Sequence, residues 1–169
     1  SMPASRLRPA FAATFLFLVF ALPQTARADW PHDASGPGVP IMSAASDQTE
    51  FRGVSDGDGG AVFVWTDARS GANDIYAQRL GSAGTPLWTT NGVALCNASG
   101  PQMNPAAVPD GSGGVFVVWA DARSGTYDIY AQRLNASGVA QWAANGPVVC
   151  NASSNQINPV VVSDGAGGV

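Results

Sequence analysis

The strongest constraint on the fold is an internal repeat with a period of 54 residues. The heptapeptide DIYAQRL occupies residues 74–80 and returns unchanged at residues 128–134. The pentapeptide DARSG at residues 67–71 returns at 121–125 with the same spacing, and so do two tryptophans and a cysteine. Nothing is inserted or deleted between these markers, so chance does not explain the match. The chain is therefore expected to consist of tandem copies of one structural unit.

This period divides the chain into segments. Residues 29–47 match the end of a unit, and residues 48–101 and 102–155 are two whole units. Residues 156–169 match the beginning of a third copy and stop before the strand that follows in the earlier copies. We therefore expect a chain that opens with the last part of one repeat and ends just inside another.

The first 28 residues have the pattern of a secretory signal peptide. Arg6 and Arg8 form a short basic start, residues 11–22 are apolar, and small residues flank Arg27 at the expected cleavage site after Ala28. The alternative is a membrane anchor, but the apolar run is shorter than the ~20 residues that a span needs. The sequence thus predicts Sec-dependent export to the periplasm or the extracellular space, with no membrane span.

The charge of the exported chain argues against nucleic acid as a partner. Without Arg6, Arg8 and Arg27, five arginines face 12 acidic residues, a net charge of −7, and the sequence contains no lysine. An acidic surface without a basic patch repels the phosphate backbone.

The second copy illustrates the strands expected in one unit. Residues 104–108 form a short apolar run, residues 115–119 are β-branched and aromatic, and residues 127–134 alternate in polarity. Turn sequences rich in Gly, Asp and Asn separate these runs. Residues 139–142 are expected to form a fourth short strand, and residues 146–150 to lead into the next unit.

Four short strands in about 50 residues, repeated in series, are typical of β-propeller blades. The predicted fold is therefore all-β, with propeller-like four-stranded blades in tandem that form an incomplete ring. A tandem β-sandwich and a β-solenoid remain alternatives. Two blades leave open edges, which favour self-association.

The repeated residues also carry a resemblance. The pattern D-x-R-x-G-x-x-D-I-Y-A-Q-R-L, preceded by D-G-x-G-G and followed by G-x-x-x-W, resembles repeats of large secreted bacterial proteins with propeller-like units. It is also similar in style to sialidase-type and TolB-type β-propellers, although the sialidase motif S-x-D-x-G-x-T-W is not reproduced. The resemblance implies a propeller-like fold and a bacterial source, and it implies no particular reaction.

Two acidic patterns are candidate sites. Asp56 and Asp58 resemble the start of a calcium loop, but later copies lose the second carboxylate, which favours a hairpin turn. Asp67, Arg69 and Asp74 place two carboxylates near one guanidinium. Because this set recurs unchanged, we expect it to lock a hairpin rather than to recognise a ligand.

The cysteines and tryptophans have structural and functional interpretations. Cys96 and Cys150 occupy equivalent positions, where neighbouring blades are usually too far apart for a disulfide. Two buried free thiols are therefore favoured over a bridge. The repeated tryptophans, such as Trp65 and Trp88, could stack on sugar rings, but their apolar neighbours favour a place in the core.

The functional hypothesis is a secreted, non-catalytic binding or scaffold module without a cofactor. The binding surface is expected in loops of one rim where the copies differ, with Asn73, Tyr127 and Asn135 as candidates for contact with a protein or glycan ligand. The alternative is the N-terminal piece of an extracellular carbohydrate-active enzyme. The enzyme hypothesis is weaker because the only histidine and the only glutamate, His32 and Glu50, precede or open the first whole repeat.

Overall fold

The computed structural model describes residues 38–169, so the predicted signal peptide and the first part of the partial repeat lie outside the described residues. The described chain forms eight β-strands and no helix, which confirms the all-β prediction. It accordingly has no helix of the length and apolar character needed to cross a bilayer. The strands are β1 (Gln48–Ser55), β2 (Ala61–Asp67), β3 (Asp74–Leu80), β4 (Val93–Cys96), β5 (Gln102–Pro109), β6 (Val115–Asp121), β7 (Asp128–Leu134) and β8 (Val148–Cys150).

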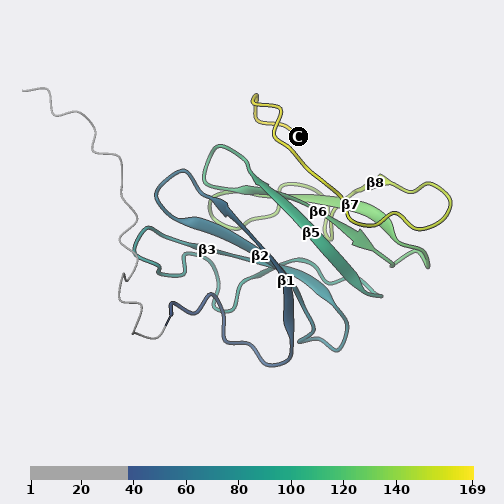
Figure 1. The fold of residues 1–169 in the computed structure, drawn as a ribbon, viewed down its shortest axis with the longest axis horizontal. Coiled ribbons are helices and arrows are strands. Elements are labelled where there is room, and N and C mark those ends of the chain that lie inside the picture. Colours follow the sequence, from purple (N-terminus) through teal and green to yellow (C-terminus); the bar gives the residue numbers. More distant parts are fainter. Residues whose placement is uncertain (1–37) are drawn as a thin grey trace, which may run out of the picture.

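The strands form two antiparallel sheets of four. Figure 1 shows the two sheets beside each other. The first sheet has the order β1-β2-β3-β4 and the second β5-β6-β7-β8, so each sheet is a simple meander made by one repeat. The register of the central hairpin is the same in both copies. Asp67 lies opposite Asp74 in the first sheet, and Asp121 opposite Asp128 in the second.

Sequence chemistry explains why the central strands form where they do. All seven residues of β6 are buried, and five of them are valine, phenylalanine or tryptophan, which fit a strand covered on both faces. Each central hairpin turns through the DARSG sequence, where Gly71 and Gly125 have φ values of 96° and 105°. Only glycine takes up these angles without steric cost, so the turn fixes the hairpin in both copies.

The first strand of each sheet contains a bulge at equivalent positions. Glu50 and Asn104 have φ values of 55° and 53°, and the pairing register shifts beside each of them. Asparagine tolerates this left-handed conformation better than glutamate does. The Glu50 carboxylate compensates with three hydrogen bonds, two of which come from Asn104 in the other sheet.

The prediction for the fourth strand was wrong. The fourth strand is residues 148–150 in the second copy, whereas residues 139–142 make only an isolated bridge between Leu134 and Ala140. This segment is held instead by the amide of Gln132, whose Oε1 accepts from the backbone N of Trp142. Residues 139–142 therefore place the Trp142 side chain against Phe116 of β6 rather than extending the sheet.

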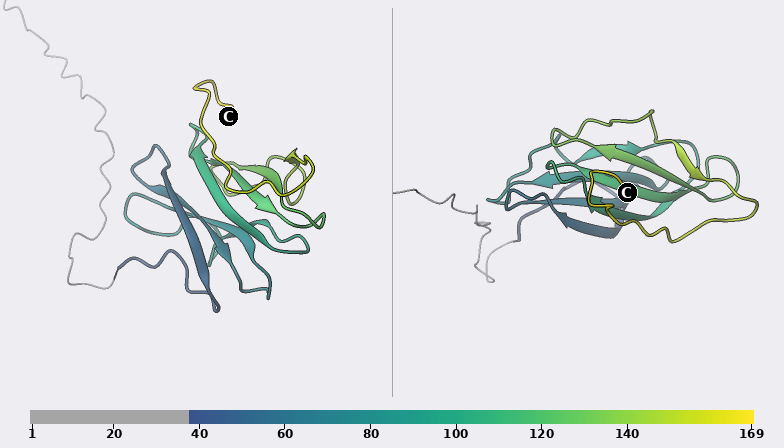
Figure 2. Two further views of the ribbon diagram at one scale, coloured as in Figure 1. Left: turned by 45° about the vertical axis from the view of Figure 1, so that its right-hand side comes forward. Right: turned by 90° about the horizontal axis from the view of Figure 1, so that it is seen from above.

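The two sheets pack face to face, with β1 and β5 side by side (Figure 2). Valines of β2, Ile75 and Ala77 of β3, and Cys96 form one side of the shared core. Val115, Val117, Trp119 and Leu134 of the second sheet form the other side. We call the face of a sheet that carries Val62, Val64 and Cys96 in the first sheet its back, and the face that carries Val115, Val117 and Trp119 in the second sheet its front. The back of the first sheet is thus buried against the front of the second, so each repeat depends on its neighbour for part of its core.

Candidate functional site

An aspartate–arginine clamp closes the central hairpin of each sheet. Asp67 accepts hydrogen bonds from Trp65 Nε1 and from the backbone N, Nε and Nη2 of Arg69. The Arg69 guanidinium also lies 4.0 Å from the centre of the Tyr76 ring. Burial acts to raise the pKa of Asp67, but hydrogen bonds from Arg69 and Trp65 outweigh it and hold the pKa below its ordinary value.

The second repeat contains the same clamp, and in the first repeat one detail of the prediction was wrong. Asp121 accepts from Trp119 Nε1 and from Arg123, as Asp67 does in the first repeat. The expected second carboxylate does not pair with the guanidinium. Asp74 accepts instead from Ser70 Oγ at 2.6 Å, and burial raises its pKa. The hairpin is locked by one carboxylate on arginine and by another on serine.

A second aspartate–arginine pair closes the turn between the first two strands. Asp56 Oδ1 accepts from the backbone N of Asp58 and of Gly60, both at 2.8 Å, as a hairpin turn requires. Its other oxygen accepts from Arg79 Nε, and Asp58 contacts the same guanidinium. Arg133 pairs with Asp110 in the same way. The two weak candidates for metal binding, Asp56 and Asp58, are thus bound to a cation of the chain itself, and Asp56 closes the hairpin turn that the sequence favours.

The described residues contain no group of three or more His, Cys, Asp or Glu side chains arranged to hold a metal ion. Sequence reasoning missed the pairing of Arg79 with Asp56. A usable signal was present, because both members recur 54 residues later as Arg133 and Asp110.

Side chains of the first repeat make specific polar contacts with the second. Trp88 Nε1 donates to the backbone O of Ala136 at 3.0 Å, and its ring lies against Gly138. Arg123 Nη2 donates to Cys96 Sγ at 3.1 Å. The two sheets are therefore held together by directional bonds in addition to the apolar core.

The linker that follows a fourth strand is also bonded to the next sheet. Asn97 donates its backbone N to Asn145 Oδ1 at 3.0 Å. The same contact occurs one repeat earlier, where Ser43 donates its backbone N to Asn91 Oδ1 at 2.9 Å. Residues 54 apart thus make equivalent bonds to the loops that precede β4 and β8.

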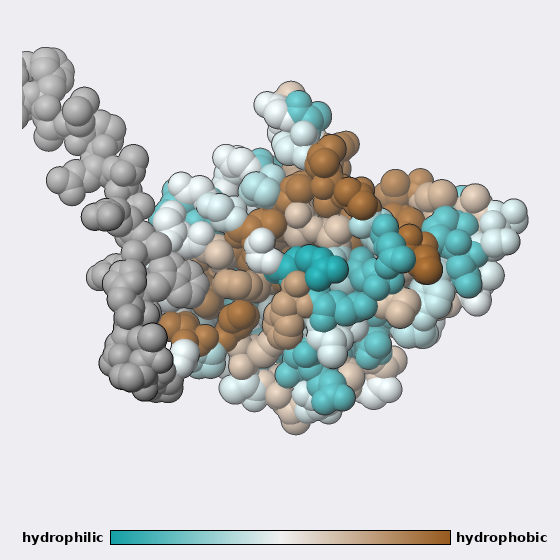
Figure 3. All heavy atoms as spheres, viewed as in Figure 1, coloured by the Kyte–Doolittle hydropathy of each residue, from teal (hydrophilic) through white to brown (hydrophobic). Residues whose placement is uncertain are grey.

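The back of the second sheet carries equivalents of these contact residues, and around β8 no described sheet covers them. Trp88 is 8% exposed, whereas its equivalent Trp142 is 39% exposed. Leu95 is 3% exposed and its equivalent Val149 is 63% exposed. We call Trp142, Val149 and Cys150 the open face. Separately from the open face, hydrophobic side chains gather along the C-terminal segment, as Figure 3 shows, where Val160 and Val162 are exposed.

The two thiols differ in the same sense. Both are free, which agrees with the favoured alternative to a disulfide, but only Cys96 is buried and Cys150 is exposed. Cys96 is covered by the second sheet, and burial raises its pKa to about 12. The expectation of two buried thiols was therefore wrong for Cys150, because no described sheet covers it.

This difference predicts selective labelling. A thiol reagent such as 5,5′-dithiobis(2-nitrobenzoate) at pH 8 is expected to modify one thiol of the folded chain rapidly and the second only after denaturant is added. The thiolate is the form that reacts, and Cys96 is both buried and protonated at this pH, so it reacts slowly. The Cys150→Ser variant is expected to lose the fast phase and Cys96→Ser to keep it. Loss of the fast phase in Cys96→Ser would contradict the assignment.

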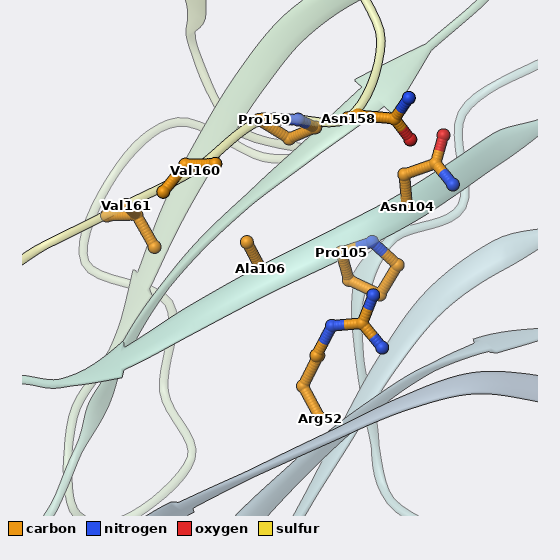
Figure 4. Close-up of a pocket in the computed structure, with 8 residues that line it drawn as sticks. All are labelled: Arg52, Asn104, Pro105, Ala106, Asn158, Pro159, Val160 and Val161. Carbon is orange, nitrogen blue, oxygen red and sulfur yellow. The ribbon is translucent and has the colours of Figure 1, made fainter.

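A pocket of about 340 Å³ lies where the first strands of the two sheets meet the C-terminal segment (Figure 4). Arg52 of β1 points toward Pro105 of β5, and the carboxamides of Asn104 and Asn158 face each other across one end. Pro159 and Val161 lie along the far wall. Neither Arg52 nor Asn158 was a candidate from the sequence.

The three candidate rim residues do not share one rim. Asn73 and Tyr127 directly precede β3 and β7, whereas Asn135 follows β7, so Tyr127 and Asn135 lie at opposite ends of one strand. Their groups also have structural roles. The backbone O of Asn73 accepts from Gln102 N, and Asn135 Oδ1 accepts from two amides of its own turn.

No protein-family model matches the chain, and no curated protein matches it.

Proposed function

We propose that the chain is a secreted, non-catalytic β-repeat module, with propeller-like blades, that acts as a scaffold and binding unit. One observation carries the scaffold role: the open face repeats the residues that bind the second sheet to the first. Trp142, Val149 and Cys150 occupy the positions of Trp88, Leu95 and Cys96. A surface with the same or similar side chains at equivalent positions fits the same partner, which is a further sheet of this repeat.

The side chains that such a partner would bring can be named from the existing interface. A turn carbonyl equivalent to that of Ala136 would accept from Trp142 Nε1, and an arginine equivalent to Arg123 would cover Cys150. An exposed apolar face of this kind marks an interaction surface. In the absence of a further sheet, the same face favours the self-association expected from the open edges.

The charged residues support a role without catalysis. Four arginines of the described chain are paired with aspartates, and each pair recurs in the other repeat. A general acid or base must be free to exchange a proton with a substrate. Carboxylates such as Asp67 and Asp121, whose oxygens accept bonds from arginine and tryptophan, are poorly suited to that task.

The scaffold role is tested by adding one unit. A second copy of residues 102–155 is inserted after Asn155, which keeps the 54-residue period. The longer chain is expected to unfold in urea with a larger m-value and a larger free energy of unfolding, because it buries more surface and gains a second inter-sheet contact. The matched control carries Trp142→Ala in the longer chain and is expected to lose most of that gain. A longer chain that is no more stable than the original would overturn the proposal.

A further inference from the structure

Arg52 is an exception among the arginines of the described chain. Arg69, Arg79, Arg123 and Arg133 each form an ion pair with an aspartate, whereas Arg52 forms none with a described residue. Its Nη1 donates a hydrogen bond to the backbone O of the neighbouring residue Phe51. An exposed guanidinium without a carboxylate partner retains its capacity for two parallel hydrogen bonds to an anion.

The repeat does not require an arginine at this position. The equivalents of Arg52 are Ala106 in the second copy and Val160 in the third. The arginines with structural roles recur, since Arg69 returns as Arg123 and Arg79 as Arg133. Arg52 therefore has no part in the architecture that the copies share, and its guanidinium is available at the pocket.

The Arg52 pocket also holds two carboxamides. Asn104 Nδ2 donates to Glu50 Oε1, which leaves the carboxamide oxygen of Asn104 as an acceptor facing Asn158. Asn158 is the repeat equivalent of Asn104 and has the same left-handed backbone, with φ values of 55° and 53°. These groups offer acceptors and donors suited to hydroxyl groups.

The carboxylate of Glu50 lies close to the pocket, since it bonds to Asn104, and a negative charge there would oppose an anionic ligand. Glu50 accepts hydrogen bonds from Thr66 Oγ1 and from two donors of Asn104, at 2.7–2.9 Å. Its oxygens are therefore occupied by protein donors, and it forms no ion pair with Arg52 within 4 Å. The Arg52 guanidinium is left as the cation that lines the pocket.

We infer that the Arg52 pocket binds an acidic sugar. A carboxylate takes the fork of Arg52, hydroxyl groups meet the carboxamides of Asn104 and Asn158, and an apolar ring face lies on Pro105, Pro159 or Val161. The volume of about 340 Å³ accommodates one or two sugar rings, in the lower range of small-molecule pockets. This inference rests on the binding role proposed above, but it does not depend on stacking of a further sheet.

Isothermal titration of the full chain with sodium D-glucuronate and with trigalacturonate tests the inference. Saturable binding is expected for the uronates and none for D-glucose, which lacks the carboxylate. The Arg52→Gln variant is expected to bind at least about tenfold more weakly, because a charge-assisted pair is lost. The affinity of the Arg52→Lys variant is expected to lie between those of the original chain and Arg52→Gln, since lysine keeps the charge without the planar fork.

Control variants and a second ligand make the outcome decisive. Thr85→Ala, at a surface position outside this pocket, is expected to bind like the original chain. An acetylated tripeptide with a free carboxyl terminus is expected to bind more weakly than trigalacturonate. Equal binding of D-glucose, unchanged affinity of Arg52→Gln, stronger binding of the peptide, or no binding of either uronate at about 10 mM would each overturn the inference. A stabilised longer chain together with failed uronate binding would remove the ligand class and leave the scaffold role standing.

Discussion

Replacing Asp121 with alanine is expected to lower the free energy of unfolding by about 3–5 kcal/mol, the range for breaking a buried ion pair by removing one partner. The Asp121 side chain is fully buried and accepts bonds from Trp119 Nε1 and from both the backbone and the side chain of Arg123. Its loss leaves these donors without their acceptor beside the inter-sheet core. Urea unfolding followed by tryptophan fluorescence measures the change.

Asp58→Ala is the matched control, because it also removes a carboxylate from an arginine. The Asp58 side chain is 76% exposed, and exposed pairs of this kind contribute about 0–1 kcal/mol. Arg79 keeps its buried partner Asp56 in that variant. Similar losses for Asp121→Ala and Asp58→Ala would contradict the structural role of the buried clamp.

Replacing Trp88 with alanine is expected to cost about 3–5 kcal/mol, as for a large aromatic side chain removed from a core. Trp88 fills the contact between the sheets, donates to the Ala136 carbonyl and lies against Gly138. The equivalent Trp142→Ala substitution is expected to cost about 1 kcal/mol, near the average for a point substitution, because no described sheet covers that ring.

Trp88→Ala and Trp142→Ala remove the same side chain from equivalent positions of one chain. The difference between their costs therefore reports on whether a neighbouring sheet covers the ring. Both variants are measured by urea unfolding under the same conditions, with the m-value checked for a change in the cooperativity of unfolding. Equal costs for Trp88→Ala and Trp142→Ala would show that the inter-sheet contact contributes little, and the stacking account would fail.

Much of the fold could be predicted because the repeat makes each pattern visible twice. The β-branched run of β6 and the DARSG turn fix a hairpin by local chemistry alone. The fourth strand was missed because three or four residues carry too little pattern to distinguish a strand from a loop. Its position depends on Gln132, whose side chain holds the preceding segment from across the sheet.

The candidate site was harder to predict because it depends on contacts between repeats. The period shows that Cys96 and Cys150 are equivalent, but not that a sheet covers only one of them. The same limit applies to the pocket, since Arg52 and Asn158 are more than 100 residues apart in sequence and meet only when the sheets stack. The one clue in the sequence is a difference between the copies, because the second copy has Ala106 where the first has Arg52.

If the sheets stack as proposed, the back of each sheet binds the front of the next. The reactivity of Cys150 in the chain with the inserted copy of residues 102–155 measures whether the added sheet covers the open face. Cys150 is expected to become as slow to react as Cys96, while the cysteine of the inserted copy takes over the fast phase. If Cys150 still reacts as fast as in the original chain, the added sheet does not cover the open face and the account is contradicted.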